Sequence, residues 1–427
     1  MSKTLLGTTA AVLLATVLPA AAQDVTCPIK VGVLHSLSGT MAISETTLKD
    51  TMEMLIEQQN EKGGVLGCEL EAVVVDPASD WPLFAEKARE LLTVHEVDVI
   101  FGNWTSVSRK SVLPVIEELN GLLFYPVQYE GEESSKNVFY TGAAPNQQAI
   151  PATDYFLEEL GVEKFALLGT DYVYPRTTNN ILESYLKSKG IAEEDIFVNY
   201  TPFGHSDWSK IVADVVALGA DGKKVGVIST INGDANVGFY KELAAAGISA
   251  DDIPVVAFSV GEEELSGLDT TNLVGHLAAW NYFQSADTDA NAEWVAAWKA
   301  RMGEDRVTND PMEAHYIGFN MWVNAAEAAG TTDVDAVRTA MYGQEFPNLT
   351  GGTAVMLPNH HLAKPVLIGE IQEDGQFDII SQTEEVPGDA WTDFLPESAV
   401  LKSDWKDLGC GMYNTETESC VQIKSNY

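Results

Sequence analysis

Basic residues are scarce in this chain. Its 427 residues include 25 Lys and Arg against 63 Asp and Glu, which gives a formal net charge of −38. A surface with this excess of negative charge repels nucleic-acid phosphates and anionic lipid headgroups. Nucleic acid and membrane surfaces are therefore excluded as main partners. The 45% hydrophobic content is nevertheless ample for a globular core.

Long hydrophobic runs are absent except for one near the start. Residues 5–18 are almost uniformly apolar, follow Lys3, and lead into small residues that end at Ala22. This pattern is typical of a cleaved secretory signal peptide over residues 1–22, and the run is too short for a membrane span. Polar residues precede Cys27, so a lipid anchor is not expected. We expect a periplasmic protein with no direct membrane anchor; the alternative is a buried N-terminal helix.

Catalytic signatures are also missing. The chain has no G-x-S-x-G elbow, no phosphate loop with Gly-Lys-Ser/Thr, no H-E-x-x-H pair and no G-x-G-x-x-G turn after its first strand. His205, Ser206 and Asp207 are adjacent, but they fit a helix start capped by Ser206 better than a catalytic trio. His360 and His361 fit a hairpin turn better than a metal site. We expect no enzymatic activity and no required cofactor.

Only four cysteines are present, and four allow three pairings. Cys27 and Cys68 each lie two residues before a strand-like run, so they meet if those strands are parallel neighbours. Cys410 and Cys420 lie close together in a polar tail. We favour disulfides 27–68 and 410–420 over a zinc site, because the spacing does not suit zinc and no histidine lies beside either pair.

The sequence does contain a regular alternation of short apolar runs and amphipathic stretches. In the first half, strands are expected at 29–34, 69–76, 97–102 and 122–125, and helices at 47–61, from Ser79 or Asp80 onward, and at 109–120. The second series has helices at 153–160, 177–189, 206–218 and 235–246, and strands at 164–169, 196–200, 225–230 and 255–259. Helices at 290–302 and 310–329 and a β-rich region at 355–380 follow. This order predicts an α/β fold with two doubly wound parallel-sheet lobes.

Loops that follow the strands carry the candidate binding residues. Parallel strands end at one edge of their sheet, and ligands of such sheets bind there. The candidates are Trp104, Ser106, Tyr125, Val127, Gln128, Tyr172, Asp234 and Glu262. Ser106 can instead cap a helix, and the two acids can serve helix starts. Because no cationic cluster accompanies these loops, they suit a small neutral ligand rich in hydrogen-bonding groups.

One further motif concerns a cation. Asp287, Asp289 and Asn291 have the alternating oxygen spacing of a calcium loop, but the Gly and distal Glu of an EF-hand are missing. A structural calcium ion is kept as an alternative to no metal.

Seven stretches together resemble the substrate-binding proteins of urea ABC transporters, within the type I periplasmic-binding superfamily. They are VLHSLSGTMA at 33–42, SDWP at 79–82, LFYPVQYEG at 123–131, PNQQ at 145–148, DYVYPR at 171–176, NGD at 232–234 and AWNYF at 279–283. Short-chain amide sensors of the same superfamily are similar too. The resemblance covers about residues 29–395 and implies capture of urea between two hinged lobes and its delivery to permease subunits in the inner membrane.

The resemblance also implies domain limits and contacts. The N-terminal lobe would comprise 24–143 and 284–345, the C-terminal lobe 144–283 and 346–395, and a polar extension 396–427. Ligand contacts are implied for the eight candidate residues above, with Val127 acting through its backbone. The amide sensors have a Thr-Pro pair where this chain has Val127 and Gln128, and the Gln128 carbonyl would favour urea over acetamide. The alternatives are a formamide- or acetamide-binding protein, a secreted amide hydrolase and a ligand-sensing regulator.

Overall fold

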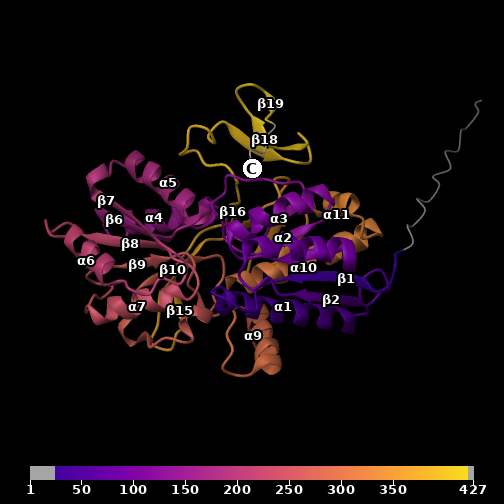
Figure 1. Cartoon of the computed structure of the whole chain (residues 1–427), viewed down its shortest axis with the longest axis horizontal. Coiled ribbons are helices and arrows are strands. Elements are labelled where there is room, and N and C mark those ends of the chain that lie inside the picture. The colour runs from indigo at the N-terminus through magenta and orange to yellow at the C-terminus, as the bar shows by residue number, and fades with distance from the viewer. Residues whose placement is uncertain (1–24, 422–427) are drawn as a thin grey trace, which may run out of the picture.

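The computed structural model describes residues 25–421, which form two lobes side by side (Figure 1). The first lobe contains a five-stranded parallel sheet in the order β2-β1-β3-β4-β5. Its strands are β1 (Ile29–Leu34), β2 (Leu70–Val75), β3 (Val99–Gly102), β4 (Leu123–Tyr125) and β5 (Val138–Tyr140). The connecting helices are α1 (Ala42–Glu61), α2 (Trp81–Glu90), the π-helical turn η1 (Leu91–His95) and α3 (Ser106–Glu118).

The second lobe is built on a seven-stranded sheet in the order β15-β14-β10-β9-β8-β6-β7. Its strands are β6 (Lys164–Thr170), β7 (Ile196–Thr201), β8 (Val225–Thr230), β9 (Val255–Ala257), β10 (Leu277–Trp280), β14 (Leu367–Ile371) and β15 (Phe377–Gln382). From β10 to β7 in this order, neighbouring strands are parallel. Strand β14 is antiparallel to both of its neighbours, β10 and β15. The helices are η2 (Pro145–Gln147), α4 (Ala149–Glu158), α5 (Val173–Ser188), η3 (Glu193–Asp195), α6 (Ser209–Leu218), α7 (Ala235–Ala245), α8 (Glu262–Leu265) and η4 (Thr270–Asn272). The two sheets confirm the predicted fold class.

Between β10 and β14 the chain returns to the first lobe. This part comprises α9 (Asp289–Met302), α10 (Asp310–Ala329), α11 (Val334–Met341), β11 (Glu345–Pro347), β12 (Thr353–Met356) and β13 (Leu362–Lys364), and β13 later pairs with β16 (Val386–Pro387). Met312, Ala354 and Leu362 belong to the same hydrophobic cluster as β1. The predicted C-terminal lobe included 346–395, but Ala354 and Leu362 of this stretch pack with the first lobe. The other domain limits inferred from the sequence stay a prediction.

One side chain connects the segments that pass between the lobes. The Asn281 amide donates to the carbonyl of Gln147, at 3.2 Å, and to that of Pro365, at 2.7 Å. Asn281 is buried, so these bonds are shielded from water. Three chain segments therefore meet at one point, as a hinge requires.

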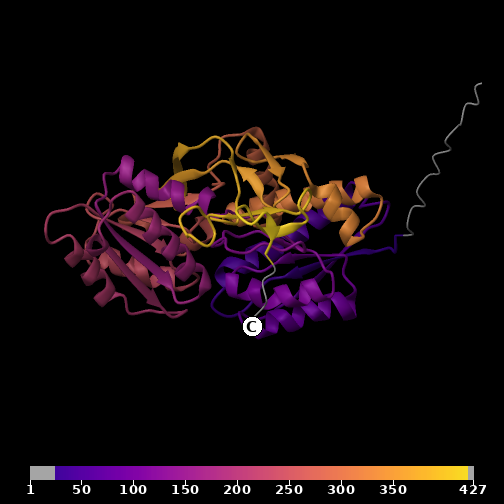
Figure 2. The ribbon, with the colours of Figure 1, turned by 90° about the horizontal axis from the view of Figure 1, so that it is seen from above.

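The C-terminal segment forms a small antiparallel sheet of β17 (Leu401–Asp404), β18 (Cys410–Asn414) and β19 (Ser419–Cys420). It sits at the top of the molecule in Figure 1 and over its middle in Figure 2. Cys410 and Cys420 are bonded within it, with Cα atoms 6.1 Å apart. Cys27 and Cys68 are bonded as well, with Cα atoms 5.2 Å apart, because β1 and β2 start side by side. Both predicted disulfides are confirmed.

Several local predictions need correction. Strand β5 is an addition to the predicted order, and α3 begins at Ser106 rather than at 109. Helix α6 begins at Ser209, so Ser206 does not cap it; instead Asp207 accepts a hydrogen bond from the Ser209 hydroxyl at 2.5 Å.

The predicted signal peptide at 1–22 lies outside the described residues. Within residues 25–421, no helix combines the length and the apolar character that a membrane span requires.

Candidate ligand-binding site

The start of α3 forms one wall of the candidate site. Thr105 caps this helix, because its side chain accepts a hydrogen bond from a backbone N–H of the first turn. The hydroxyl of Ser106 is therefore not needed as a cap and donates to Oε2 of Glu130 at 2.5 Å. The carbonyl of buried Trp104 accepts a hydrogen bond from the hydroxyl of Tyr125.

Arg109 lies one turn further along α3 and is completely buried. Its Nε donates to Oε1 of Glu133 at 2.7 Å, and its Nη2 lies 3.4 Å from Oε1 of Glu130. The guanidinium carbon is 4.5 Å from the ring centroid of Tyr125 and 4.7 Å from that of Tyr129. The cation is thus held by two carboxylates and two aromatic faces, an arrangement for which a planar guanidinium is suited.

The charges in this group balance. Burial alone would raise the pKa of Glu133, but Arg109 and Lys110 outweigh burial and lower it to about 2. Burial would lower the pKa of Arg109, but Glu133 and Glu130 raise it above its ordinary value. Lys110 is 2.7 Å from the second oxygen of Glu133. Two cations therefore face two carboxylates, and no positive charge is left over for an anionic ligand.

Gln128 reaches from the first lobe to the second. Its amide nitrogen donates to the carbonyl of Phe258 at 2.7 Å and to Oγ of Ser259 at 2.6 Å. Its carbonyl oxygen is buried and has no hydrogen-bond partner among the described residues, and the same holds for the hydroxyl of Tyr174. Burial raises the pKa of Tyr174, and the polar side chains of Gln128 and Ser259 close to its hydroxyl oppose this rise. The three side chains therefore lie together, although neither neighbour meets the distance and angle of a hydrogen bond to that hydroxyl.

Two other loops complete the group. Burial and then the neighbouring Tyr125 raise the pKa of Tyr172, which places these two phenols near each other. The ring of Tyr172 is 6.1 Å from that of Tyr174. Trp104 Nε1 donates to the Asn232 side-chain carbonyl at 3.4 Å, which links the first lobe to the loop after β8.

The predicted residues divide into those that meet and those that do not. The structure groups Trp104, Ser106, Tyr125, Gln128 and Tyr172, with Val127 buried beside Gln128. Asp234 does not join them, because it is exposed at the start of α7 and makes no capping hydrogen bond. Contact of the grouped residues with a ligand stays a prediction.

Glu262 belongs to a different buried group. Its Oε1 accepts from the backbone N–H of Gln284 at 2.7 Å, and its other oxygen has no partner among the described residues. Burial, reinforced by nearby carboxyl groups, raises its pKa to about 8. Glu264 on the same short helix accepts from the hydroxyl of Ser44 in α1 at 2.6 Å, which places α8 against the first lobe.

The eight candidates chosen from the sequence do not include Arg109, Glu130, Glu133, Tyr174 or Ser259, although Glu130 and Tyr174 lie in two of the stretches quoted there. One signal was available: the loop after β4 holds Glu130, Glu132 and Glu133, and such a density of acids beside buried aromatics calls for a cation. The identity of that cation depends on the meeting of this loop with helix α3, which periodicity does not reveal.

The predicted calcium loop has other contacts. Asn291 Oδ1 accepts from the hydroxyl of Tyr282 at 2.7 Å, and its amide donates to two backbone carbonyls at 2.8 Å each. Its side-chain oxygen is thus already a hydrogen-bond acceptor. Among residues 25–421, no three His, Cys, Asp or Glu side chains are arranged to hold a metal ion.

Two hinged α/β lobes with a polar and aromatic group between them define a two-lobed solute-binding protein. Comparison with known families agrees: residues 29–397 match the model of the periplasmic binding protein domain. The chain belongs to the periplasmic binding protein family, a family of binding proteins and not of enzymes.

Curated relatives cover most of the chain at low identity. A Leu/Ile/Val-binding protein homolog 7 from Brucella suis is 25% identical over 379 residues, 81% of this chain and 90% of that protein. A homolog 8 from Brucella abortus is 23% identical and covers 88% and 95%. A protein named limonene hydroxylase from Geobacillus stearothermophilus is 34% identical over 134 residues, and the match spans 31% of this chain and only 24% of that protein.

Solved structures share the fold. A solute-binding protein from Rhodopseudomonas palustris BisB5, in complex with 3,4-dihydroxybenzoic acid, superposes with a TM-score of 0.73 at 18% identity and covers 84% of this chain and 98% of its own. A leucine-binding protein from Thermotoga maritima gives a TM-score of 0.71 at 16% identity and covers 83% and 99%. Identities this low support the fold and leave the ligand open.

Proposed function

We propose that the protein is the periplasmic solute-binding component of an ABC importer and that it captures urea between its lobes. The observation that carries the proposal is the balanced charge around Arg109. Glu130 and Glu133 neutralise this buried cation, so the group between the lobes offers hydroxyls, amides and aromatic faces to a solute. A neutral solute rich in hydrogen-bonding groups fits such surroundings at the lowest desolvation cost.

Urea matches the polar atoms in this group. It is planar and offers four N–H donors and one carbonyl acceptor. The buried carbonyl oxygen of Gln128 and the hydroxyl oxygen of Tyr174, both without partners among the described residues, are suitable acceptors. The first backbone N–H groups of α3, beside Ser106, have no acceptor within the helix and suit the urea carbonyl. The rings of Tyr125 and Tyr172 would cover its faces.

The named ligands of some similar proteins differ from urea in charge. Hydroxybenzoic acids carry a carboxylate, and leucine carries a carboxylate together with an ammonium group. In either case the carboxylate would meet Glu130 close to Ser106 with no unpaired cation of the described group beside it. A buried anion without a counter-charge is strongly disfavoured. We therefore expect neutral solutes to bind and these acids not to bind.

Calorimetry of the mature protein tests this ranking with urea, formamide, acetamide, leucine and benzoate. Four heavy atoms limit urea to roughly −6 kcal/mol, which corresponds to a Kd of tens of micromolar. Acetamide lacks one amino group and should bind more weakly by about 1–3 kcal/mol, because a buried acceptor stays unpaired. Tighter binding of acetamide would support a short-chain amide carrier, and ammonia release would support a hydrolase.

A matched pair of glutamine variants locates the site. Gln128 and Gln148 both donate an amide hydrogen bond to the carbonyl of Phe258, at 2.7 and 3.2 Å. Gln128→Met should weaken urea binding at least tenfold, whereas Gln148→Met should leave the affinity nearly unchanged.

Ser106→Ala and Tyr125→Ala should also weaken binding at least tenfold. N-terminal sequencing of native protein should find a start near Gln23 and would contradict export if it found Met1.

A further inference from the structure

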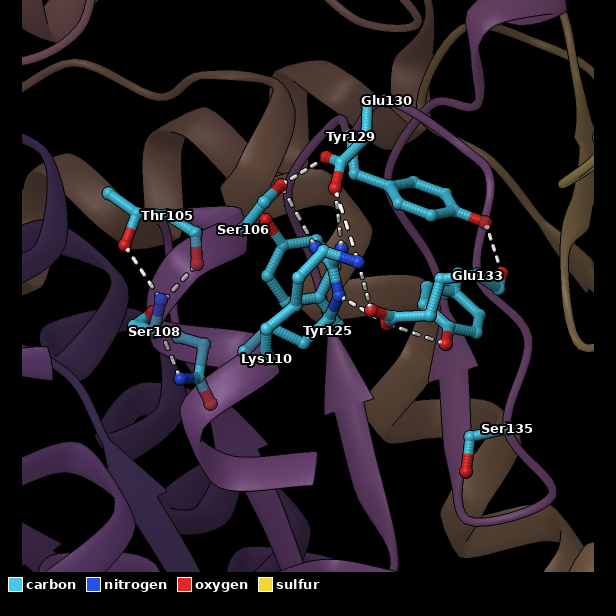
Figure 3. A network of polar contacts seen from close by, with 12 residues as sticks. Thr105, Ser106, Ser108, Lys110, Tyr125, Tyr129, Glu130, Glu133 and Ser135 are labelled. Atoms are coloured by element: carbon cyan, nitrogen blue, oxygen red, sulfur yellow. Dashed lines mark hydrogen bonds and ion pairs between the residues drawn. The ribbon is translucent and has the colours of Figure 1, made fainter. Parts of the chain in front are cut away.

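The loop over residues 129–135 connects two parts of the molecule that lie far apart in sequence. On one side it carries Glu130, which accepts a hydrogen bond from Ser106 at the start of α3 (Figure 3). Glu133, on the same loop, accepts one from Arg109 of that helix. These contacts set the position of the Arg109 guanidinium over the ring of Tyr125. Any restraint on this loop therefore also restrains the start of α3, which forms one wall of the candidate site.

The outer side of the loop is held by the segment that leads into the C-terminal sheet. The backbone N–H of Glu132 donates to the carbonyl of Ala390 at 2.7 Å, and the Glu132 carboxylate accepts from the hydroxyl of Ser398. Trp405 Nε1 donates to Oγ of Ser134 at 3.0 Å. Glu132 and Ser134, which the C-terminal segment holds, thus alternate along the loop with Glu130 and Glu133, which bind α3.

Packing between the loop and the C-terminal segment is tight. Gly131 has a φ of +68°, and a Cβ there would lie 2.5 Å from the carbonyl oxygen of Ala390. A Cβ on Gly411 in β18 would lie 2.5 Å from both Oγ of Ser134 and the ring of Trp405. Side chains larger than hydrogen are excluded at both positions, so the two segments approach with little freedom to shift.

We propose that the C-terminal segment 389–414 is a positioning element for the ligand site, in which Ser398 and Trp405 hold loop 129–135 so that Glu130 and Glu133 keep Arg109 and Ser106 in place. Neither residue touches the ligand. The inference rests on the proposed location of the site between the lobes and is independent of which neutral solute binds there.

The double variant Ser398→Ala/Trp405→Phe removes both side-chain anchors and keeps an aromatic ring at 405. Thr415→Ala is the matched control: its hydroxyl donates to the carbonyl of Val400 at the end of the same sheet, and it makes no side-chain hydrogen bond to loop 129–135. Hydrogen exchange of the ligand-free full chain and calorimetry with urea are compared for the two variants and the parent.

We expect faster amide exchange in residues 129–135 and also at the start of α3, residues 104–109, together with at least fivefold weaker urea binding. The control should match the parent in both measurements. The proposal would be overturned if exchange became faster in 129–135 but stayed unchanged in 104–109, or if it stayed unchanged throughout. Both outcomes are measured on the ligand-free protein. If the parent does not bind urea, the exchange pattern alone still decides this inference, and only the proposed ligand is wrong.

Returning Trp405 alone to the double variant should restore part of the exchange protection, since it restores the bond to Ser134. A drop in melting temperature without a change in the exchange of 104–109 would assign the segment a purely structural role and overturn the proposal.

Discussion

In the first lobe, the Arg109 side chain is completely buried and is paired with Glu130 and Glu133. In the second lobe, Arg176 follows the site residues Tyr172 and Tyr174 but is 55% exposed and is paired with Asp171 alone. The first-lobe hydroxyls of Ser106 and Tyr125 have partners within their own lobe, whereas the hydroxyl of Tyr174 has none among the described residues.

The difference suggests that the two walls have different tasks. A fully paired, buried network keeps one geometry, because any rearrangement would leave a charge uncompensated. Polar groups without protein partners are free to satisfy a ligand when the lobes close. We expect the first lobe to present a preformed wall and the second lobe to supply the contacts that depend on the ligand.

The largest effect should come from removing the buried cation. Arg109→Met leaves Glu130 and Glu133 buried without their main counter-charge, so the free energy of unfolding should fall by about 3–5 kcal/mol. Guanidinium-induced unfolding measures the loss and avoids urea, the proposed ligand. The triple variant Arg109→Met/Glu130→Gln/Glu133→Gln should regain part of the stability, and no recovery would show that packing rather than charge holds the wall.

The pH dependence should separate the two lobes. In the second lobe, burial raises the pKa of Glu262 to about 8 and that of Glu263 to about 7. The folded protein keeps these protons at pH values where the unfolded chain, with carboxyl pKa values near 4.3, has lost them. The free energy of unfolding should therefore fall as the pH rises from about 4.5 to about 8, by up to about 1.4 kcal/mol for each pKa unit.

Glu133 in the first lobe behaves in the opposite sense, whereas burial raises the pKa of Glu45 and Glu132 in the same lobe. The pKa of Glu133 is lowered to about 2, so its stabilising contribution is present above pH 4.5 and is lost as the pH falls toward 2. Glu262→Gln should flatten the stability profile between pH 6 and 8 and leave the acid side unchanged. Glu264 and Asp310 also have raised pKa values, and Arg306 opposes the rise at Glu263, so a residual slope is expected. An unchanged slope in this variant would remove Glu262 as its source.

Elements with local signals could be predicted from the sequence. Helix α10 occupies the predicted 310–329, because Asn309 caps its start and Gly330, in a left-handed conformation, ends it. Strand β8 likewise occupies the predicted 225–230. Strand β5 has only three residues and exists because it pairs with β4 and bridges to His361, contacts between distant segments that periodicity does not carry.

The candidate site shows the same division. Ser106, Tyr125 and Gln128 were identifiable because they lie at or shortly after strand ends, where ligands of parallel sheets bind. The Arg109–Glu130 pair was not, since its partners are 21 residues apart and belong to helix α3 and to the loop after β4. Asp234 lies at a helix start as expected, yet the sequence does not tell whether such an acid turns toward the site or toward solvent.

A smaller effect should come from Tyr174 in the second lobe. Tyr174→Phe removes a hydroxyl that has no hydrogen-bond partner among the described residues, so the free energy of unfolding should change little. Urea affinity should fall about tenfold, equivalent to about 1.4 kcal/mol, because one acceptor for the ligand is lost. Calorimetry and guanidinium unfolding of this variant separate the two effects. Unchanged affinity would remove Tyr174 from the ligand-dependent wall.

The smallest effect is expected at Arg176, the exposed counterpart of Arg109. Its Nε lies 2.6 Å from Asp171 and its guanidinium carbon 4.5 Å from the ring centroid of Tyr200, but water screens both interactions at this exposure. Arg176→Met should therefore lower the free energy of unfolding by less than about 1 kcal/mol. Guanidinium-induced unfolding of Arg176→Met and Arg109→Met measures the two losses of stability under the same conditions. The comparison is direct, since both variants replace an arginine by the same side chain. A loss at Arg176 as large as that at Arg109 would mean that burial and double pairing do not distinguish the two walls, and the preformed character assigned to the first lobe would have to come from elsewhere.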